Sequence, residues 1–173
     1  MNLRTDIAEY KENAFRRLQT IERFYQSLSL NQAIEYAASA ADPEGKINPH
    51  QRRIGKKRLR HSAKIIKNYT SDIKRAKSFA DLFVVTEVIK EENKGLGDLW
   101  SYDTALRIAF NRGRSFNPQS VFVQAGVIKG VKKIFPTLRM TTRTLPVAKF
   151  PKLLQRLEPF EIENFLCIWG KIR

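Results

Sequence analysis

Apolar residues recur every three to four positions along most of this chain, which is the spacing of one face of an α-helix. The first series runs from Leu3 to Leu28 and predicts one long amphipathic helix whose opposite face carries charges of both signs. A second helix is expected over residues 29–41, because Ser29 is a favoured capping residue. Residues 42–49, which contain two prolines and a glycine, predict a loop.

Two further helices are expected toward the middle of the chain. Residues 50–69 have so narrow an apolar stripe that most of the predicted helix surface is basic, and Gly55 weakens this helix. Ser78, with Asp81 three residues later, resembles a capping box. It predicts the start of a strongly apolar helix that ends near Asn93.

Two glycines, Gly95 and Gly97, stand between this apolar helix and the next one. Because glycine adopts backbone angles that other residues avoid, the pair permits a very tight turn. Trp100, Thr104 and Ile108 then give the following helix its buried face. The sequence therefore predicts two helices joined by a tight turn near the centre of the chain.

An Asn-Pro pair at positions 117–118 is a strong helix start, so a helix is expected over residues 117–135. The Val-Phe-Val run at positions 121–123 is also compatible with a short strand, which is the alternative. Gly126 and Gly130, four positions apart, would let another helix approach closely.

The last part of the chain predicts an extended connector over residues 137–151 and a short helix over residues 152–157. A final helix begins around Pro159 and is apolar enough to dock on the core. Together the elements predict an all-α fold, with one domain of seven or eight helices over residues 1–173. Its parts are the N-terminal helices (1–41), the basic helix with the glycine turn (50–135) and the C-terminal helices (152–173).

The composition supports a folded protein without metal or disulfide chemistry. Hydrophobic residues make up 42% and charged residues 28% of the 173 positions, as in ordinary globular proteins. The single cysteine, Cys167, has no partner for an internal disulfide, and no Cys/His cluster has zinc-binding spacing. Residues 1–28 lack the apolar run of a signal peptide or membrane span. We therefore expect a cytoplasmic protein with no cofactor, no metal and no membrane partner.

The net charge of +15 is concentrated in two segments. Residues 42–77 carry twelve basic and three acidic side chains, net +9, and residues 111–157 carry ten basic side chains and no acid. Residues 78–110 between them have three basic and six acidic side chains, net −3. Segregated positive charge is typical of proteins that bind polyanions, because neutralised phosphates release their counterions. Nucleic acid is the favoured partner, DNA before RNA.

The glycine turn offers a mechanism for such binding. The start of a helix leaves backbone N–H groups without intrahelical partners, and the helix dipole favours an anion there. A phosphate would bind these groups, and nearby cations would neutralise neighbouring phosphates. The expected nucleic-acid-binding residues are Lys94, Gly95, Leu96, Gly97, Arg112 and Arg114 around the turn, and Arg52, Arg53, Lys56, Lys57 and Arg60 on the basic helix.

Residues 95–107 resemble the helix-hairpin-helix proteins. The wider pattern Gly-Leu-Gly…Trp-Ser-Tyr-Asp-Thr-Ala-Leu-Arg-Ile, followed by Asn-Pro…Val-Phe-Val-Gln-Ala-Gly, is similar to uncharacterised bacterial proteins of this kind. The turn also distantly resembles that of the helix-hairpin-helix DNA glycosylases, all-α enzymes that excise damaged bases. This resemblance implies that the turn binds a phosphate group. It does not extend to catalysis, because Leu99 stands where lyase members have lysine and Asp103 lies closer to the turn than their catalytic aspartate.

Two alternative functions remain open from the sequence. The first is a glycosylase-like enzyme or nuclease that uses Asp103 as its acid, although Asp103 is also placed to pair with Arg107 four residues later. The second is a basic interaction protein that binds an acidic partner. In that case the helix from Leu3 to Leu28 could form the seam of a homodimer.

Overall fold

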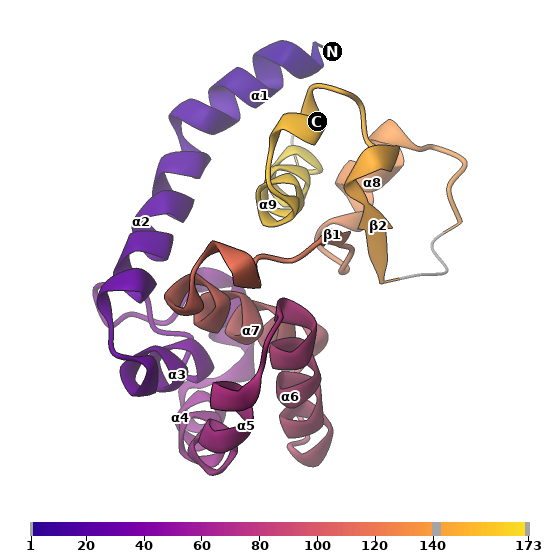
Figure 1. Cartoon of the computed structure of the whole chain (residues 1–173). Helices are drawn as coiled ribbons and strands as arrows, with labels where there is room; N and C mark the ends of the chain where they lie inside the picture. Colours follow the sequence, from indigo (N-terminus) through magenta and orange to yellow (C-terminus); the bar gives the residue numbers. More distant parts are fainter. Residues whose placement is uncertain (1, 140–142, 172–173) are drawn as a thin grey trace. The chain divides into compact units, whose positions relative to one another are not determined.

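The computed structural model of the chain describes residues 2–139 and 143–171. Figure 1 shows that helices dominate these residues, which confirms the predicted all-α fold. The helices are α1 (Leu3–Glu12), α2 (Ala14–Ser27), α3 (Leu30–Ala38), α4 (Lys56–Ile65), α5 (Thr70–Arg75), α6 (Phe79–Glu92), α7 (Asp98–Arg112), α8 (Ile128–Ile134) and α9 (Pro159–Trp169). Two strands, β1 (Ser120–Phe122) and β2 (Thr144–Pro146), form a small sheet. The described residues also form the short 3₁₀ helices η1 (Pro49–Ile54), η2 (Ile66–Tyr69), η3 (Arg114–Phe116), η4 (Val147–Lys149) and η5 (Leu154–Arg156).

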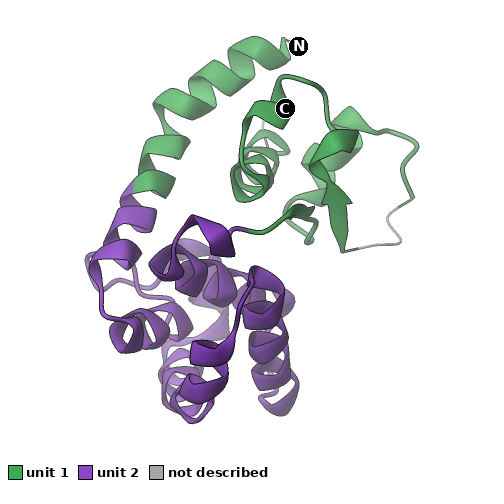
Figure 2. Cartoon of the chain, in the orientation of Figure 1, with its two compact units in different colours: residues 1–19, 118–173 green, residues 20–117 purple. Residues whose placement is uncertain are grey.

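The chain divides into two compact units, which Figure 2 shows in different colours. Unit 1 combines Met1–Gln19 with Pro118–Arg173, and unit 2 is the continuous segment Thr20–Asn117. The sequence predicted one domain over residues 1–173. Helix α2 contains the division between them.

Unit 2 is built around helix α7, ten of whose fifteen residues are buried. Its neighbours α3 and α6 pack along it, which brings fully buried aromatic and aliphatic side chains together. The carbonyl oxygen of Ala38, at the end of α3, accepts hydrogen bonds from the indole Nε1 of Trp100 (2.9 Å) and from the hydroxyl of Ser62 (2.9 Å). These bonds give the C-terminus of α3 the partners that a helix end lacks within itself.

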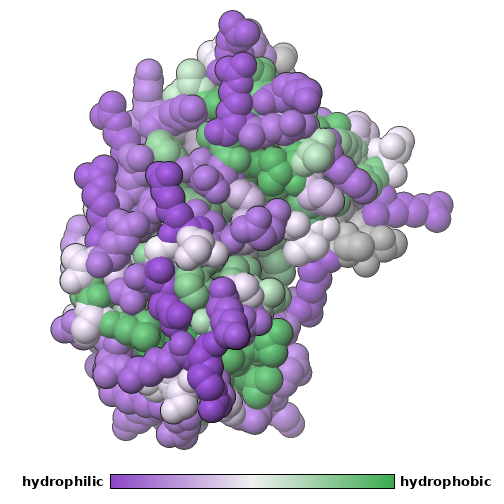
Figure 3. All heavy atoms as spheres, in the orientation of Figure 1, coloured by the Kyte–Doolittle hydropathy of each residue, from purple (hydrophilic) through white to green (hydrophobic). Residues whose placement is uncertain are grey.

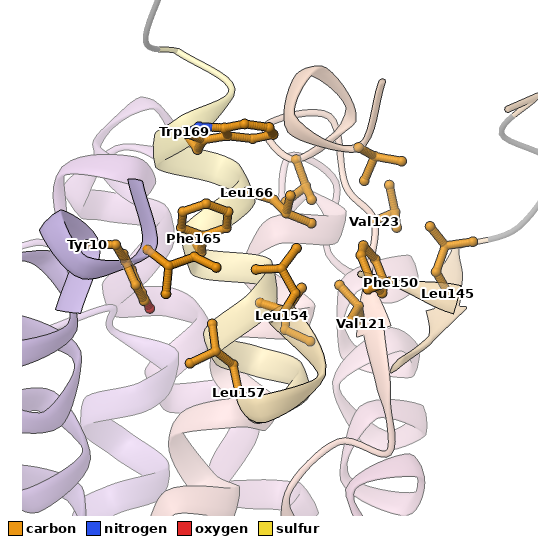
Figure 4. Packing of buried hydrophobic residues seen from close by; sticks show 14 residues of the cluster. Tyr10, Val121, Val123, Leu145, Phe150, Leu154, Leu157, Phe165, Leu166 and Trp169 are labelled. Carbon is orange, nitrogen blue, oxygen red and sulfur yellow. The ribbon is translucent and has the colours of Figure 1, made fainter. Parts of the chain in front are cut away.

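Unit 1 has its own hydrophobic core, which Figure 4 shows from close by. Tyr10 of α1 meets Phe165 of α9 in an edge-to-face contact with ring centroids 5.5 Å apart. Helices α8 and α9 approach so closely at Gly130 that a Cβ there would lie 2.3 Å from the carbonyl oxygen of Leu166. The sequence-based expectation of a close approach at this glycine is therefore confirmed.

The prediction of a helix over residues 117–135 was wrong for the first half of this range. Strand β1 occupies Ser120–Phe122 and pairs antiparallel with β2, so that Val121 lies opposite Leu145. Val121, Phe122 and Val123 are all buried, and such β-branched and aromatic residues suit a strand. The short strand, our alternative, therefore describes these residues, and α8 begins only at Ile128.

Two other predicted helices are interrupted. The helix expected from Leu3 to Leu28 is two helices, α1 and α2, which are separated at Asn13. The side-chain amide and the backbone N–H of Asn13 both donate to the carbonyl of Glu9. Asparagine competes in this way for helix hydrogen bonds. The helix expected over residues 50–69 is broken at Gly55, where φ is +86°, into η1, α4 and η2. The helix expected over residues 152–157 is only the 3₁₀ turn η5.

Hydrophilic side chains cover most of the face shown in Figure 3. Hydrophobic atoms reach the surface over α6, where Val84 and Val88 are exposed. Within residues 2–139 and 143–171, no helix has both the length and the apolar character that a membrane crossing requires. Thr141 and Thr142 of the predicted connector lie outside the described residues.

Candidate nucleic-acid interface

The joint between α6 and α7 contains a left-handed backbone position at Gly95, where φ is +96°. The N–H of Leu96 donates to the carbonyl of Asn93 (3.2 Å) and closes the turn. Gly97 is the N-cap of α7, so Asp98 occupies the first helical position rather than the cap. Of the three amides expected to hold a phosphate, the one at Leu96 is therefore engaged within the turn.

Lys90 of α6 links α6 to α7 beside this turn through an ion pair with Asp98. Its ammonium group contacts carboxylate oxygens of Asp98 (2.9 Å), Glu87 (3.0 Å) and Glu91 (3.1 Å). Burial by itself would lower the pKa of Lys90, but hydrogen bonds to Asp98, Glu87 and Glu91 outweigh it and raise this pKa above its ordinary value. Lys90 thus stays charged at neutral pH and has a structural role. The carboxylate of Asp98 also places negative charge at the start of α7, which weakens an anion site built from the turn amides alone.

Arg58 of helix α4 lies directly against the turn. A Cβ built on Gly95 would be 2.9 Å from Nε and 3.0 Å from Cζ of Arg58, so the absent side chain leaves room for the guanidinium group. The basic helix and the glycine turn, 37 positions apart in sequence at these two residues, therefore form one continuous surface of unit 2. We call the exposed side of α4 together with Lys94, Gly95 and Leu96 the α4–turn surface.

Two adjoining hollows mark the α4–turn surface and share Arg58 and His61. The basic hollow, of about 890 Å³, is lined by cations and one histidine: Lys56, Lys57, Arg58, Arg60, His61 and Lys64. The turn hollow, of about 380 Å³, is lined by Arg58, His61, Ser62, Glu92, Asn93, Lys94 and Leu96. Among the described residues, none that lines the basic hollow is acidic, and Glu92 is the acidic residue in the lining of the turn hollow.

The structure brings several predicted residues together on this surface. Lys56, Lys57 and Arg60 line the basic hollow, and Lys94 and Leu96 line the turn hollow. Their cationic side chains are exposed, as are those of Arg52 and Arg53 on η1. Arg58 is not among the residues expected from the sequence, because its position in the basic run does not reveal its contact with Gly95.

Arg112 does not belong to the α4–turn surface, contrary to our expectation, and Arg114 follows it in the 3₁₀ helix η3. Arg112 ends α7, about 20 Å along the helix from the turn at 1.5 Å per residue. Its guanidinium donates to the carbonyls of Ile73 (2.9 Å) and Ala76 (3.2 Å) and lies 4.4 Å from the ring centroid of Phe116. Arg112 therefore caps the end of α5.

The second basic segment is divided between the units at Pro118. Part of its charge serves the fold of unit 1. Lys133, for example, donates to the carbonyl of Trp169 at the end of α9 (2.9 Å) and lies 5.0 Å from the Trp169 ring centroid. Cations at a helix C-terminus interact favourably with its dipole.

Asp103 has a well-defined structural environment. Its Oδ2 atom accepts a hydrogen bond from the fully buried Gln51 (2.8 Å) and forms the predicted contact with Arg107 (3.4 Å). Arg107 is itself buried and reaches toward the carbonyl of Ala37. These contacts link η1, α3 and α7, and they account for the aspartate without a catalytic role.

The comparisons with known proteins add no relative. Neither the protein-family models, the curated proteins nor the solved structures contain a match to this chain. Among the residues that the structure describes, no group of three or more His, Cys, Asp or Glu side chains could hold a metal ion. The functional argument therefore depends on the geometry and charge of the α4–turn surface.

Proposed function

We propose that this protein binds nucleic acid through the phosphates, using the α4–turn surface of unit 2. The observation that carries the proposal is the contact of Arg58 with Gly95, which joins the basic helix to the exposed turn. Five cations, Lys56, Lys57, Arg58, Arg60 and Lys64, then line one hollow, to which the described part of the chain contributes no carboxylate. Duplex DNA is the proposed ligand, and the reducing cytoplasm is the proposed location.

The mechanism is neutralisation of phosphates with release of counterions. If the five cations each neutralise one phosphate, log K falls with log salt with a slope of about −4 to −5 for duplex DNA. Between 50 and 200 mM salt such a slope lowers affinity by roughly several hundredfold. The contacts are to the backbone, so duplex affinity is expected to be independent of sequence.

The test is a salt titration of DNA binding measured by fluorescence anisotropy. Replacing Lys56, Lys57 and Arg60 together by glutamine should reduce the magnitude of the slope by about 3 and weaken binding to all duplexes alike. The matched control replaces Arg4, Lys11 and Arg17, three exposed cations of α1 and α2, by glutamine and removes the same charge. Affinity that is constant across the salt range, or an equal loss in both triple variants, would reject the proposed surface.

The same assay separates nucleic acid from an acidic protein partner. Duplex DNA, single-stranded DNA and RNA of one sequence are compared with polyglutamate of equal charge as competitors. DNA should compete best, with RNA weaker. If polyglutamate displaces DNA as well as unlabelled DNA does, the surface recognises acidic chains in general, and the nucleic-acid proposal fails.

A further inference from the structure

The lining of the turn hollow includes a carboxylate in addition to cationic side chains. Glu92 lies in a lining that also contains Arg58, His61 and Lys94. The phenolic hydroxyl of Tyr69 donates a hydrogen bond to Glu92 Oε2, which fixes the position of that carboxylate. This bond occupies one of about four lone-pair positions of the carboxylate, so the group can accept further hydrogen bonds.

A carboxylate beside a phosphate-binding surface lowers affinity unless it meets a hydrogen-bond donor. Nucleobases supply donors on their Watson–Crick edges, and these edges are accessible to side chains in unpaired strands. Guanine presents two neighbouring donors there, N1–H and the N2 amino group, and both oxygens of one carboxylate can accept them. Thymine instead flanks its N3–H with two carbonyl oxygens, which repel a carboxylate.

The remaining lining suits a nucleotide. The hollow's volume of about 380 Å³ falls within the range of roughly 300–1,000 Å³ for small-molecule sites. Leu96 supplies an apolar contact for a base and His61 a ring on which a base can stack. Arg58 and Lys94 supply charge for the attached phosphate.

We propose that the turn hollow binds an unpaired guanine nucleotide, with the Glu92 carboxylate accepting hydrogen bonds from N1–H and N2 while Arg58 and Lys94 hold its phosphate. This inference rests on the proposed nucleic-acid function and adds a base preference for unpaired strands to the sequence-independent binding of duplexes. Tyr69 positions Glu92 and does not contact the base.

The test compares short thymidine oligonucleotides that carry isolated guanine, inosine or adenine residues with one that carries thymine alone. The guanine oligonucleotide should bind at least about fivefold more tightly than the thymine one, the lower end of what a good bidentate base contact contributes. Inosine lacks the N2 amino group and should fall between guanine and thymine.

Glu92→Gln should reduce the guanine preference, because one of the two acceptor oxygens becomes a donor. Binding of the thymine oligonucleotide should be unchanged or slightly stronger, because a negative charge is lost. Glu91→Gln is the matched control, since it removes the same charge from the neighbouring exposed residue, which does not line the hollow. It should retain the preference. Glu91 and Glu92 are exposed residues at the C-terminal end of α6, so both variants are expected to fold.

The outcomes distinguish this inference from the function on which it rests. Equal binding of all four oligonucleotides by the unaltered protein would overturn the guanine site and leave phosphate binding intact. A guanine preference that is undiminished in Glu92→Gln, or that falls equally in Glu91→Gln, would also overturn it. If none of the oligonucleotides and no duplex binds, the proposed function fails as well.

Discussion

Replacing Gly95 by alanine tests the contact that joins α4 to the turn. At φ +96° a residue with a Cβ atom is strained, at a cost of roughly 1–2 kcal/mol. The new Cβ would also lie 2.9 Å from Nε of Arg58, so the flexible guanidinium must move away. We therefore expect Gly95→Ala to lower the free energy of unfolding by about 1–2 kcal/mol and, separately, to weaken DNA binding because Arg58 is displaced.

Gly113 provides a matched control at the other end of α7. Its φ is +94°, and a Cβ built there meets nothing within 4 Å. Gly113→Ala should therefore lower stability by a similar amount, about 1–2 kcal/mol, without moving a cation. The difference between the two variants in DNA affinity then reports the Arg58 contact rather than backbone strain.

The assay combines urea unfolding, followed by circular dichroism, with DNA binding by anisotropy. Both alanine variants are also made in an Arg58→Ala background, which completes a double-mutant cycle. In that background Gly95→Ala should have little further effect on DNA affinity, because no guanidinium remains to be displaced. Equal losses of affinity in Gly95→Ala and Gly113→Ala, or a Gly95→Ala loss that persists in full without Arg58, would refute the reasoning.

Three further predictions concern the cores and the buried polar groups. Gly130→Ala places a Cβ against the Leu166 carbonyl and should cost about 3 kcal/mol or more in urea unfolding; Gly126→Ala, whose Cβ would meet only a sulfur at 3.3 Å, should cost clearly less, and equal costs would contradict the close approach. Burial raises the pKa of Tyr25 from 10.0 to about 12, so unfolding free energy should be independent of this group below pH 10 and fall as pH rises from 10 through 12; Tyr25→Phe should remove this part of the alkaline loss, and an unchanged pH profile would show that another group causes it. Asp103→Asn should lower stability by about 1–2 kcal/mol, because a charged acceptor is lost, and leave DNA affinity unchanged; a loss of affinity at unchanged stability would contradict the purely structural role of Asp103.

Helical periodicity and capping signals predicted the centre of the fold well. Ser78 caps α6 as expected, its hydroxyl accepting from the N–H of Asp81. The buried face of α7, with Trp100 and Ile108, was also predicted correctly. These features are local, because they depend on residues within a few positions of one another.

The errors arose where tertiary contacts outweigh local preference. The Asn-Pro signal at 117–118 is a good helix start in isolation, but residues 120–122 pair with a strand more than twenty positions away. Arg112 has no sequence signal that distinguishes it from a phosphate-binding arginine, and its partners are carbonyls of α5 and its end. Arg58 was missed for the same reason, since only the folded chain places it on Gly95.

Unit 1 is built from two segments that are distant in sequence, so its two parts are synthesised at different times. Unit 2 is one uninterrupted segment, residues 20–117, so its synthesis is complete before that of unit 1, and domains generally fold as units during synthesis. Ile7 and Tyr10 are synthesised before residues 20–117, whereas α9, against which Tyr10 packs, is synthesised after them. During that interval the apolar face of the first helix has no native partner, which makes the nascent chain a candidate substrate for chaperones.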